Sequence, residues 1–294
     1  MVGNGAGATD GALRERLEAL LGELGVASPP TSVADHGARL GTVTGVLPDR
    51  VLDLAVTESG RRRLRAELRG RRWAEERGIG VPEVLAAADD GRWLLSRRLH
   101  PAPSGGPQWT EAAVAAAVRI APLPAPQGRP WQPPAGRGLG RVRGTVQDAG
   151  RLVRAGVRLT ELRAVRVAAA QLPLSEVTHG DFCAANAVLD AERGLVVLEW
   201  TGVRAGPRHR DLLTLWASTP GAEDRERIAD TVLDRTAGWE GPDVGLLWHA
   251  VALEQLVGRV TGSGRSEGPD LAAARSRLSE ARSRAAELGS PVAG

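Results

Sequence analysis

The chain has 294 residues, of which 42% are apolar and 25% are charged, a composition typical of a soluble globular protein and not of a disordered segment. The sequence contains neither lysine nor tyrosine, the side chains that titrate near pH 10. Its pI near 10.4 therefore reflects their absence, and the net charge at pH 7 is only +3. No apolar run reaches the ~20 residues of a membrane span, and the opening MVGNGAGATD lacks the features of a secretory signal, so we expect a cytoplasmic protein without membrane contact.

The sequence pattern of the first hundred residues predicts a small sheet with helices. Leucines at helical spacing predict a helix over residues 11–25, and glycines with β-branched residues predict short antiparallel strands over 36–57. An arginine-rich stretch predicts a helix over 61–77, and a strand is expected at 93–95. This part of the chain is therefore predicted to be rich in β-structure.

The remainder is predicted to be mainly helical. Two Pro/Gly-rich segments at 101–107 and 122–140 precede helical patterns over 142–171 and 211–288, with short strand-like pieces at 187–189 and 195–200. We therefore predict an α+β protein with two lobes. The N-lobe would span residues 1–100 and the C-lobe residues 101–294.

One segment carries a pattern of polar residues suited to phosphoryl transfer. Asp181 and Asn186 lie on a predicted loop, and Glu199 closes the apolar run before Trp200. In phosphoryl transfer, a loop aspartate accepts the proton of an attacking hydroxyl, while an asparagine and a carboxylate hold Mg²⁺. The spacing favours that chemistry.

This pattern resembles the aminoglycoside phosphotransferase and choline kinase group of the protein-kinase-like fold. His179-Gly180-Asp181 followed by Asn186 is similar to the catalytic loop of that family, and Leu198-Glu199-Trp200 is similar to its metal-binding strand. The resemblance implies that Asp181 is catalytic and that Asn186 and Glu199 are the metal ligands. It also implies that His179 and Asp211 support the loop. Glu199 stands where the family usually has aspartate.

The resemblance implies a bilobal fold with a small β-rich N-lobe and a larger, mainly helical C-lobe. Within the N-lobe, it places a glycine-containing hairpin over the nucleotide phosphates, with Gly37 and Gly41 as candidates. It also places Glu67 where the family has a helix glutamate that pairs with a strand lysine.

The strand lysine itself is missing from the sequence. Its expected position holds Asp53 or a neighbouring residue, and an aspartate there would repel phosphates. We predict that an arginine supplies the positive charge, with Arg50 or one of Arg61–Arg63 as candidates, although a guanidinium is bulkier than an ammonium.

The predicted function is Mg²⁺-assisted transfer of the γ-phosphoryl group of ATP or GTP to a hydroxyl. The acceptor is a small molecule, such as an antibiotic, sugar or alcohol, or a natural-product precursor peptide. The missing lysine supports an alternative, a pseudokinase that binds or scaffolds a partner protein. Nucleic-acid binding through the arginine helix is the least favoured, because the helix lacks interleaved aromatic residues.

Overall fold

The computed structural model describes residues 6–35, 40–102, 105–125, 146–236, 241–262 and 269–290. The chain divides into two compact units. The first unit contains Met1–Ala102 and Val188–Thr201, and the second contains Pro103–Ala187 and Gly202–Gly294. The later segment 188–201 thus returns to the unit formed by the first hundred residues.

The first unit is built on an antiparallel five-stranded sheet with the order β1-β2-β3-β5-β4. Its strands are β1 (Ser32–Asp35), β2 (Thr42–Val46), β3 (Arg50–Ala55), β4 (Val84–Ala87) and β5 (Trp93–Arg97). The alternation of side chains along β3 sends Leu52 and Leu54 to one face and Asp53 to the other. Strands β2, β3 and β5 formed where strands were expected, whereas β1 and β4 were not predicted.

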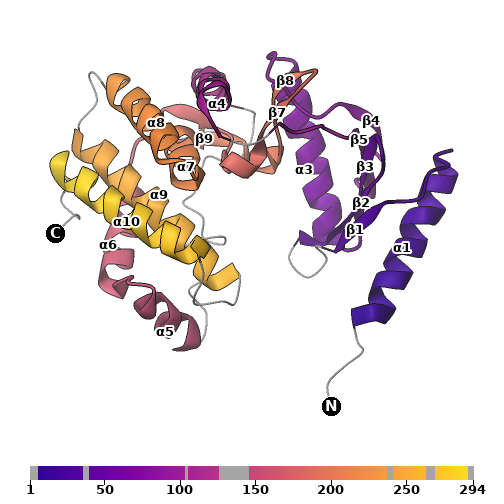
Figure 1. The fold of residues 1–294 in the computed structure, drawn as a ribbon, viewed down its shortest axis with the longest axis horizontal. Helices are drawn as coiled ribbons and strands as arrows, with labels where there is room; N and C mark the ends of the chain where they lie inside the picture. Colours follow the sequence, from indigo (N-terminus) through magenta and orange to yellow (C-terminus); the bar gives the residue numbers. More distant parts are fainter. Residues whose placement is uncertain are drawn as a thin grey trace. The chain divides into compact units, whose positions relative to one another are not determined.

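Two helices cover opposite faces of this sheet (Figure 1). Leu17 and Leu21 of α1 (Ala6–Glu23) share a buried cluster with Leu52 and Leu54 of β3. On the other face, α3 (Glu58–Glu75) packs Leu64 against a second apolar cluster. Because side chains alternate along β3, Asp53 lies on the face that α3 covers.

Helix α3 begins before the predicted arginine run. Thr57 has an extended backbone, and its side-chain oxygen accepts a hydrogen bond from the backbone N–H of Gly60 at 3.1 Å. This hydroxyl satisfies one of the four amide groups that the first helical turn leaves without a partner. The cap fixes where the arginines of α3 lie along the sheet.

The segment after the hairpin of β7 (Ala187–Asp190) and β8 (Gly194–Val197) lies against α3. The Trp200 ring lies 6.2 Å from the ring of Trp73 on α3, and its Nε1 donates to the Val197 carbonyl at 2.7 Å. Gly70 of α3 faces the backbone of Trp200 so closely that a Cβ would meet it. This close approach brings Glu199 to α3.

We expect Gly70→Ala to destabilise the protein because the added methyl would force Trp200 away from α3. An overpacking cost of about 1–3 kcal/mol outweighs the gain of about 0.5–1 kcal/mol from replacing a helix glycine. Gly11→Ala is the matched control, since Gly11 lies inside α1 with no atom within 4 Å of its added Cβ. Denaturant unfolding of both variants tests this, and a Gly70→Ala protein as stable as wild type would contradict the close packing.

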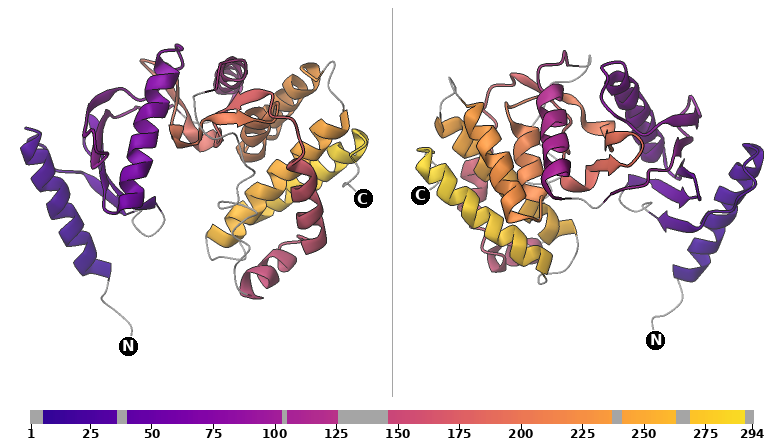
Figure 2. Two further views of the ribbon diagram at one scale, coloured as in Figure 1. Left: turned by 180° about the vertical axis from the view of Figure 1, so that it is seen from behind. Right: turned by 45° about the horizontal axis from the view of Figure 1, so that its top comes forward.

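The second unit is mainly helical (Figures 1 and 2). Its helices are α4 (Pro107–Ile120), α5 (Val146–Arg154), α6 (Leu159–Ala169), α7 (Arg210–Ser218), α8 (Ala222–Asp234), α9 (Gly241–Gly262) and α10 (Pro269–Glu287). Helices α9 and α10 pack side by side, and α7 packs against both α8 and α9. A short antiparallel pair, β6 (Glu176–Thr178) and β9 (Arg204–Gly206), completes the unit. Among the described residues, no helix has both the length and the apolar character needed to cross a membrane.

The predicted α+β class, with a β-sheet region followed by a helical region, is confirmed. Where the structure describes the helical stretch expected over 142–171, from residue 146 on, it contains α5 and α6, separated by a turn at 155–158. Helix α4 was not predicted. Gly37 and most of the Pro/Gly-rich segment at 122–140 lie outside the described residues.

Candidate active site

The loop after β6 brings the predicted aspartate and asparagine together. It runs from His179 to Cys183 and leads into the 3₁₀ turn η2 (Ala184–Asn186). The Nδ2 atom of Asn186 donates to the backbone carbonyl of Asp181 at 2.9 Å, while the Asp181 residue itself is exposed. This hydrogen bond leaves the side-chain oxygen of Asn186 for other partners and fixes it beside Asp181.

Asp211, in the first turn of α7, holds the start of this loop. Its carboxylate accepts hydrogen bonds from the backbone N–H groups of His179 at 2.6 Å and Gly180 at 3.3 Å. Burial raises the pKa of the Asp211 carboxyl to about 6, although both hydrogen bonds favour the ionised form. Gly180 has a φ of 89° and lies against the Gly202 backbone, where a side chain would clash. The loop is therefore anchored at its first two residues.

Two other residues of the loop, His179 and Cys183, are buried and partly buried respectively. His179 is fully buried, its Nδ1 accepts from the Asp181 backbone N–H at 3.3 Å, and its ring meets Phe182 edge-on at 5.8 Å. Burial raises the pKa of the Cys183 thiol to about 11, so this cysteine stays protonated at neutral pH. Both residues thus support the loop's conformation and neither has the environment of a nucleophile.

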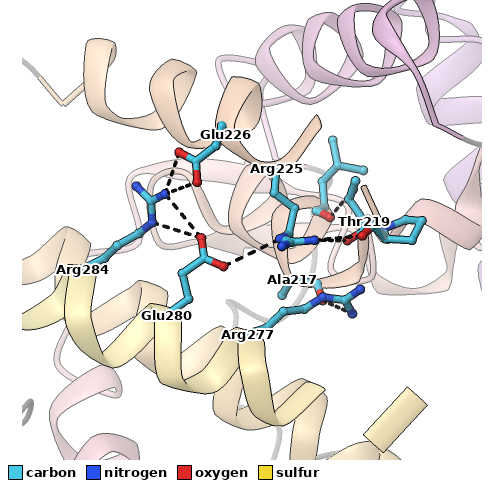
Figure 3. A network of polar contacts seen from close by, with 9 residues as sticks. Ala217, Thr219, Arg225, Glu226, Arg277, Glu280 and Arg284 are labelled. Carbon is cyan, nitrogen blue, oxygen red and sulfur yellow. Dashed lines mark hydrogen bonds and ion pairs between the residues drawn. The ribbon is translucent and has the colours of Figure 1, made fainter. Parts of the chain in front are cut away.

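The far end of α7 supports the loop at a second point. Ser218 Oγ accepts the backbone N–H of Ala184 at 2.8 Å and donates within α7. Arginines from neighbouring helices bind the carbonyl groups at this end, with Arg277 on Ala217 at 3.0 Å and Arg225 on Pro220 at 2.9 Å (Figure 3). Arg277 thus satisfies a carbonyl that the last turn of α7 leaves without a helical partner, and Arg225 holds the segment that follows the helix.

The network in Figure 3 ties α8 and α10 together around that helix end. Arg284 of α10 binds both carboxylate oxygens of Glu226 on α8, at 2.7 and 2.8 Å, and also contacts Glu280. Glu280 in turn lies 3.7 Å from Arg225. Several charges share partners here, so the network orders the helix end more firmly than isolated surface pairs do.

In the first unit, the predicted metal ligand Glu199 already has a cationic partner. Its carboxylate forms an ion pair with the guanidinium of Arg63, on α3. The Glu199 side chain is 43% exposed and Arg63 is 13% exposed. Glu199 also has a φ of 63°, a left-handed conformation that non-glycine residues rarely adopt and that is often found at functional sites.

Glu67 and Asp53 form the neighbouring part of this charged cluster. Glu67, 5% exposed, accepts the Nε–H of Arg71 at 2.7 Å, and Arg71 continues to the hydroxyl of Ser96 on β5 at 2.7 Å. Asp53 accepts the hydroxyl of Thr44 at 2.5 Å. Burial raises the pKa of both carboxyls, and nearby Glu199 raises them further, while Arg71 opposes the shift. The cation on Glu67 therefore comes from its own helix and not from a strand.

The other predicted nucleotide-binding residues remain predictions. Gly41 has a φ of 71°, and its carbonyl accepts the backbone N–H of Val56 at 2.9 Å, so it packs where α3 begins. Arg50 pairs with its neighbour Asp49 at 3.2 Å, and both side chains are exposed. Neither arrangement tests a contact with phosphate.

The chemistry of the predicted metal ligands suits Mg²⁺. Asn186 and Glu199 offer amide and carboxylate oxygens, the hard donors that this ion prefers. Among the described residues, no three histidine, cysteine, aspartate or glutamate side chains gather as a metal cluster. Mg²⁺ commonly takes only one or two protein ligands when phosphates and water complete its shell.

Sequence reasoning missed Arg71 and Ser218. Arg71 follows Glu67 by one helical turn, and a Glu-to-Arg spacing of four was a readable signal for their pairing. Nothing in the sequence around Ser218 indicates its bond to Ala184, because that contact joins distant parts of the chain.

Comparisons with known proteins agree on the family. The model of the phosphotransferase enzyme family, APH, matches residues 39–245. A comparison with curated protein sequences finds no match. A complex of a thermostable mutant of aminoglycoside phosphotransferase APH(4)-Ia with AMP-PNP and hygromycin B matches with a TM-score of 0.59 and 17% identity, covering 93% of this chain and 98% of that chain.

Other solved structures have the same fold. Macrolide 2'-phosphotransferase MphH from Brachybacterium faecium matches with a TM-score of 0.52 and 18% identity, over 90% of this chain and 98% of that chain. A choline/ethanolamine kinase family protein from Mesorhizobium loti matches with a TM-score of 0.51 and 18% identity, over 94% of each chain. The resemblance inferred from the loop motif is confirmed by the family model, which spans more than half of the sequence. The chain belongs to the phosphotransferase enzyme family.

Proposed function

We propose that this protein transfers the γ-phosphoryl group of ATP or GTP to a hydroxyl group. The observation that carries the proposal is the loop around Asp181. Asp181 is exposed, while Asp211 holds the backbone before it and Asn186 binds its backbone carbonyl. A general base must be held in place and yet remain accessible to its substrate. The loop combines these two properties.

In the proposed reaction, the acceptor hydroxyl oxygen attacks the γ-phosphorus. The bond between that phosphorus and the oxygen bridging to the β-phosphate breaks, and the nucleoside diphosphate leaves with the electron pair. Asp181 accepts the hydroxyl proton and orients the attacking oxygen. His179 and Asp211 keep the backbone of Asp181 in position through the hydrogen bonds described above.

We assign Mg²⁺ to Asn186 and Glu199, on the basis of their oxygen donors and their places in the family motif. When bound, the ion neutralises charge on the transferred phosphoryl group. Glu199 would offer its carboxylate from a backbone with positive φ, and Arg63 balances the charge of Glu199.

A turnover assay with a panel of acceptors tests this proposal. Hygromycin B, a macrolide, choline, simple sugars and a serine- or threonine-containing peptide would each be offered with ATP or GTP and Mg²⁺. Structural neighbours include complexes that contain ADP or AMP-PNP together with hygromycin B. We expect release of diphosphate nucleotide that depends on one acceptor class, with a phosphoryl group found on that acceptor by mass spectrometry.

A pseudokinase is the second candidate, and two observations favour it. Asp53 puts a carboxylate on the face of the sheet that α3 covers, and Glu199 is already paired with Arg63. A pseudokinase would show no turnover with any acceptor and would co-purify with a specific partner protein. Acceptor-dependent turnover would reject it.

We expect turnover to fall as the pH drops through about 6, because Asp211 becomes protonated there. Protonation removes the charge that strengthens both hydrogen bonds and turns one of the two oxygens into a hydroxyl, a poorer acceptor, so Asp211 holds the loop less firmly. The stability of the fold depends on pH in the opposite direction. The folded-state pKa of Asp211 lies above its ordinary value of 3.8, so the free energy of unfolding falls as the pH rises from about 4 to 6. A pH–rate profile of wild type and Asp211→Asn tests this, and an unchanged acidic limb in the variant would assign the limb to another group.

A further inference from the structure

Arg63 differs from the other arginines of α3 in its hydrogen bonding. Its Nη2 binds Glu199, whereas its Nη1 is buried and has no hydrogen-bond partner among the described residues. Buried donors are rarely left without a partner in folded proteins. A donor in this state, beside a carboxylate assigned to the metal, marks a place for an oxygen atom of a ligand.

The alternatives among the nearby arginines are less suited to a phosphate. Arg71 is buried and already binds Glu67 and Ser96. Arg62 contacts Glu58 at 3.9 Å on the exposed side of α3, and Arg61 lies 4.0 Å from Asp90. Of these four, only Arg63 pairs with Glu199 and has a buried donor atom, Nη1, without a hydrogen-bond partner among the described residues.

We propose that Arg63 is the phosphate-binding cation of this protein, with Nη2 remaining on Glu199 and Nη1 donating to a phosphate oxygen of the nucleotide. This inference rests on the proposed function. A guanidinium presents five donors in a fixed plane, so one group can bind a carboxylate and a phosphate at the same time. An ammonium is a point charge and serves two such partners less well. The cation that the family takes from a strand lysine would here come from α3.

A consequence concerns the metal dependence of binding. Because Arg63 neutralises Glu199 and reaches phosphate directly, nucleotide binding should keep a component that needs no divalent ion. Asp53 of β3 faces α3, Glu67 lies on α3 itself, and Arg71 balances only part of the charge of these two carboxylates. Removal of Arg63 would then leave the bound phosphates beside three carboxylates.

Isothermal titration with ADP and with GDP, in Mg²⁺ and in EDTA, tests the proposal on the full chain. We expect Arg63→Ala to weaken binding of the preferred nucleotide about 10- to 100-fold in both conditions, the scale of a charge-assisted hydrogen bond. Arg69→Ala is the matched control, since Arg69 is exposed on the same helix, and it should change affinity less than about twofold. Arg63→Lys should recover part of the loss.

The outcomes separate this inference from the proposed function. If Arg63→Ala binds nucleotide as well as wild type in EDTA, the inference is wrong, while acceptor-dependent turnover would still support the function. If folded wild-type protein binds neither nucleotide, both are wrong. Thermal unfolding of each variant checks folding, and the half-exposed Glu199 can be solvated once its partner is removed, so Arg63→Ala should fold.

Discussion

Asp181→Asn is expected to lower turnover by about 10²-fold or more, the usual scale for loss of a general base. The substitution keeps the size of the side chain but removes its negative charge and its ability to accept the hydroxyl proton. The hydrogen bonds of this residue to Asn186 and His179 use its backbone carbonyl and N–H, so the loop should keep its shape. Nucleotide affinity and thermal unfolding should therefore stay close to those of wild type.

Steady-state kinetics with the identified acceptor, together with nucleotide titration, measure the two effects separately. Asp230→Asn is a suitable control because this aspartate is exposed on α8. It should leave turnover unchanged. An Asp181→Asn protein that retains most of its rate would show that Asp181 is not the general base. The loop would then contribute only by positioning the substrate.

Local patterns in the sequence were sufficient to predict most of the first unit. The strands expected over 36–57 include β2 and β3, and the arginine-rich pattern predicted α3. The start of α3 differed because Thr57 caps it, which moves its first residue to Glu58. Helix α4 was missed because its alanine-rich sequence follows a Pro/Gly-rich segment with no strong periodicity.

The polar loop was predictable because its residues are close in sequence, whereas the partners of Glu199 were not. Arg63 and Glu199 meet only because Gly70 lets the backbone of Trp200 lie against α3. That contact depends on tertiary packing of a hairpin from far along the chain. The roles of Asp181, Asn186 and Glu199 in catalysis and metal binding stay predictions until the variants are measured.

The second large effect concerns Arg71. We expect Arg71→Ala to lower the free energy of unfolding by about 3–5 kcal/mol, the cost of leaving one partner of a buried ion pair alone. Glu67 is 5% exposed and Arg71 provides its hydrogen bond, so the variant would bury a carboxylate without its cation. The bond from Arg71 to Ser96, which joins α3 to β5, would also be lost.

The loss of stability in Arg71→Ala should increase with pH. Burial already raises the pKa of the Glu67 carboxyl, and Arg71 opposes the shift, so removing Arg71 should raise that pKa further. A folded-state pKa above the unfolded value means that the folded protein binds the additional proton, and stability falls as pH rises through that window. The destabilisation measured by denaturant unfolding should therefore be larger at pH 8 than at pH 5.

A second substitution tests whether the helix arginine replaces the strand lysine of the family. Asp53 lies on the face of β3 that α3 covers, so Asp53→Lys in the Arg71→Ala background would supply a cation to Glu67 from the strand and remove a competing carboxylate. We expect this double variant to recover most of the lost stability. The double variant with Asp53→Ala, which removes the carboxylate without adding a cation, should recover less. Equal recovery by the two would mean that repulsion from Asp53, and not a missing cation, accounts for the loss; little loss in Arg71→Ala alone would show that Glu67 needs no cation.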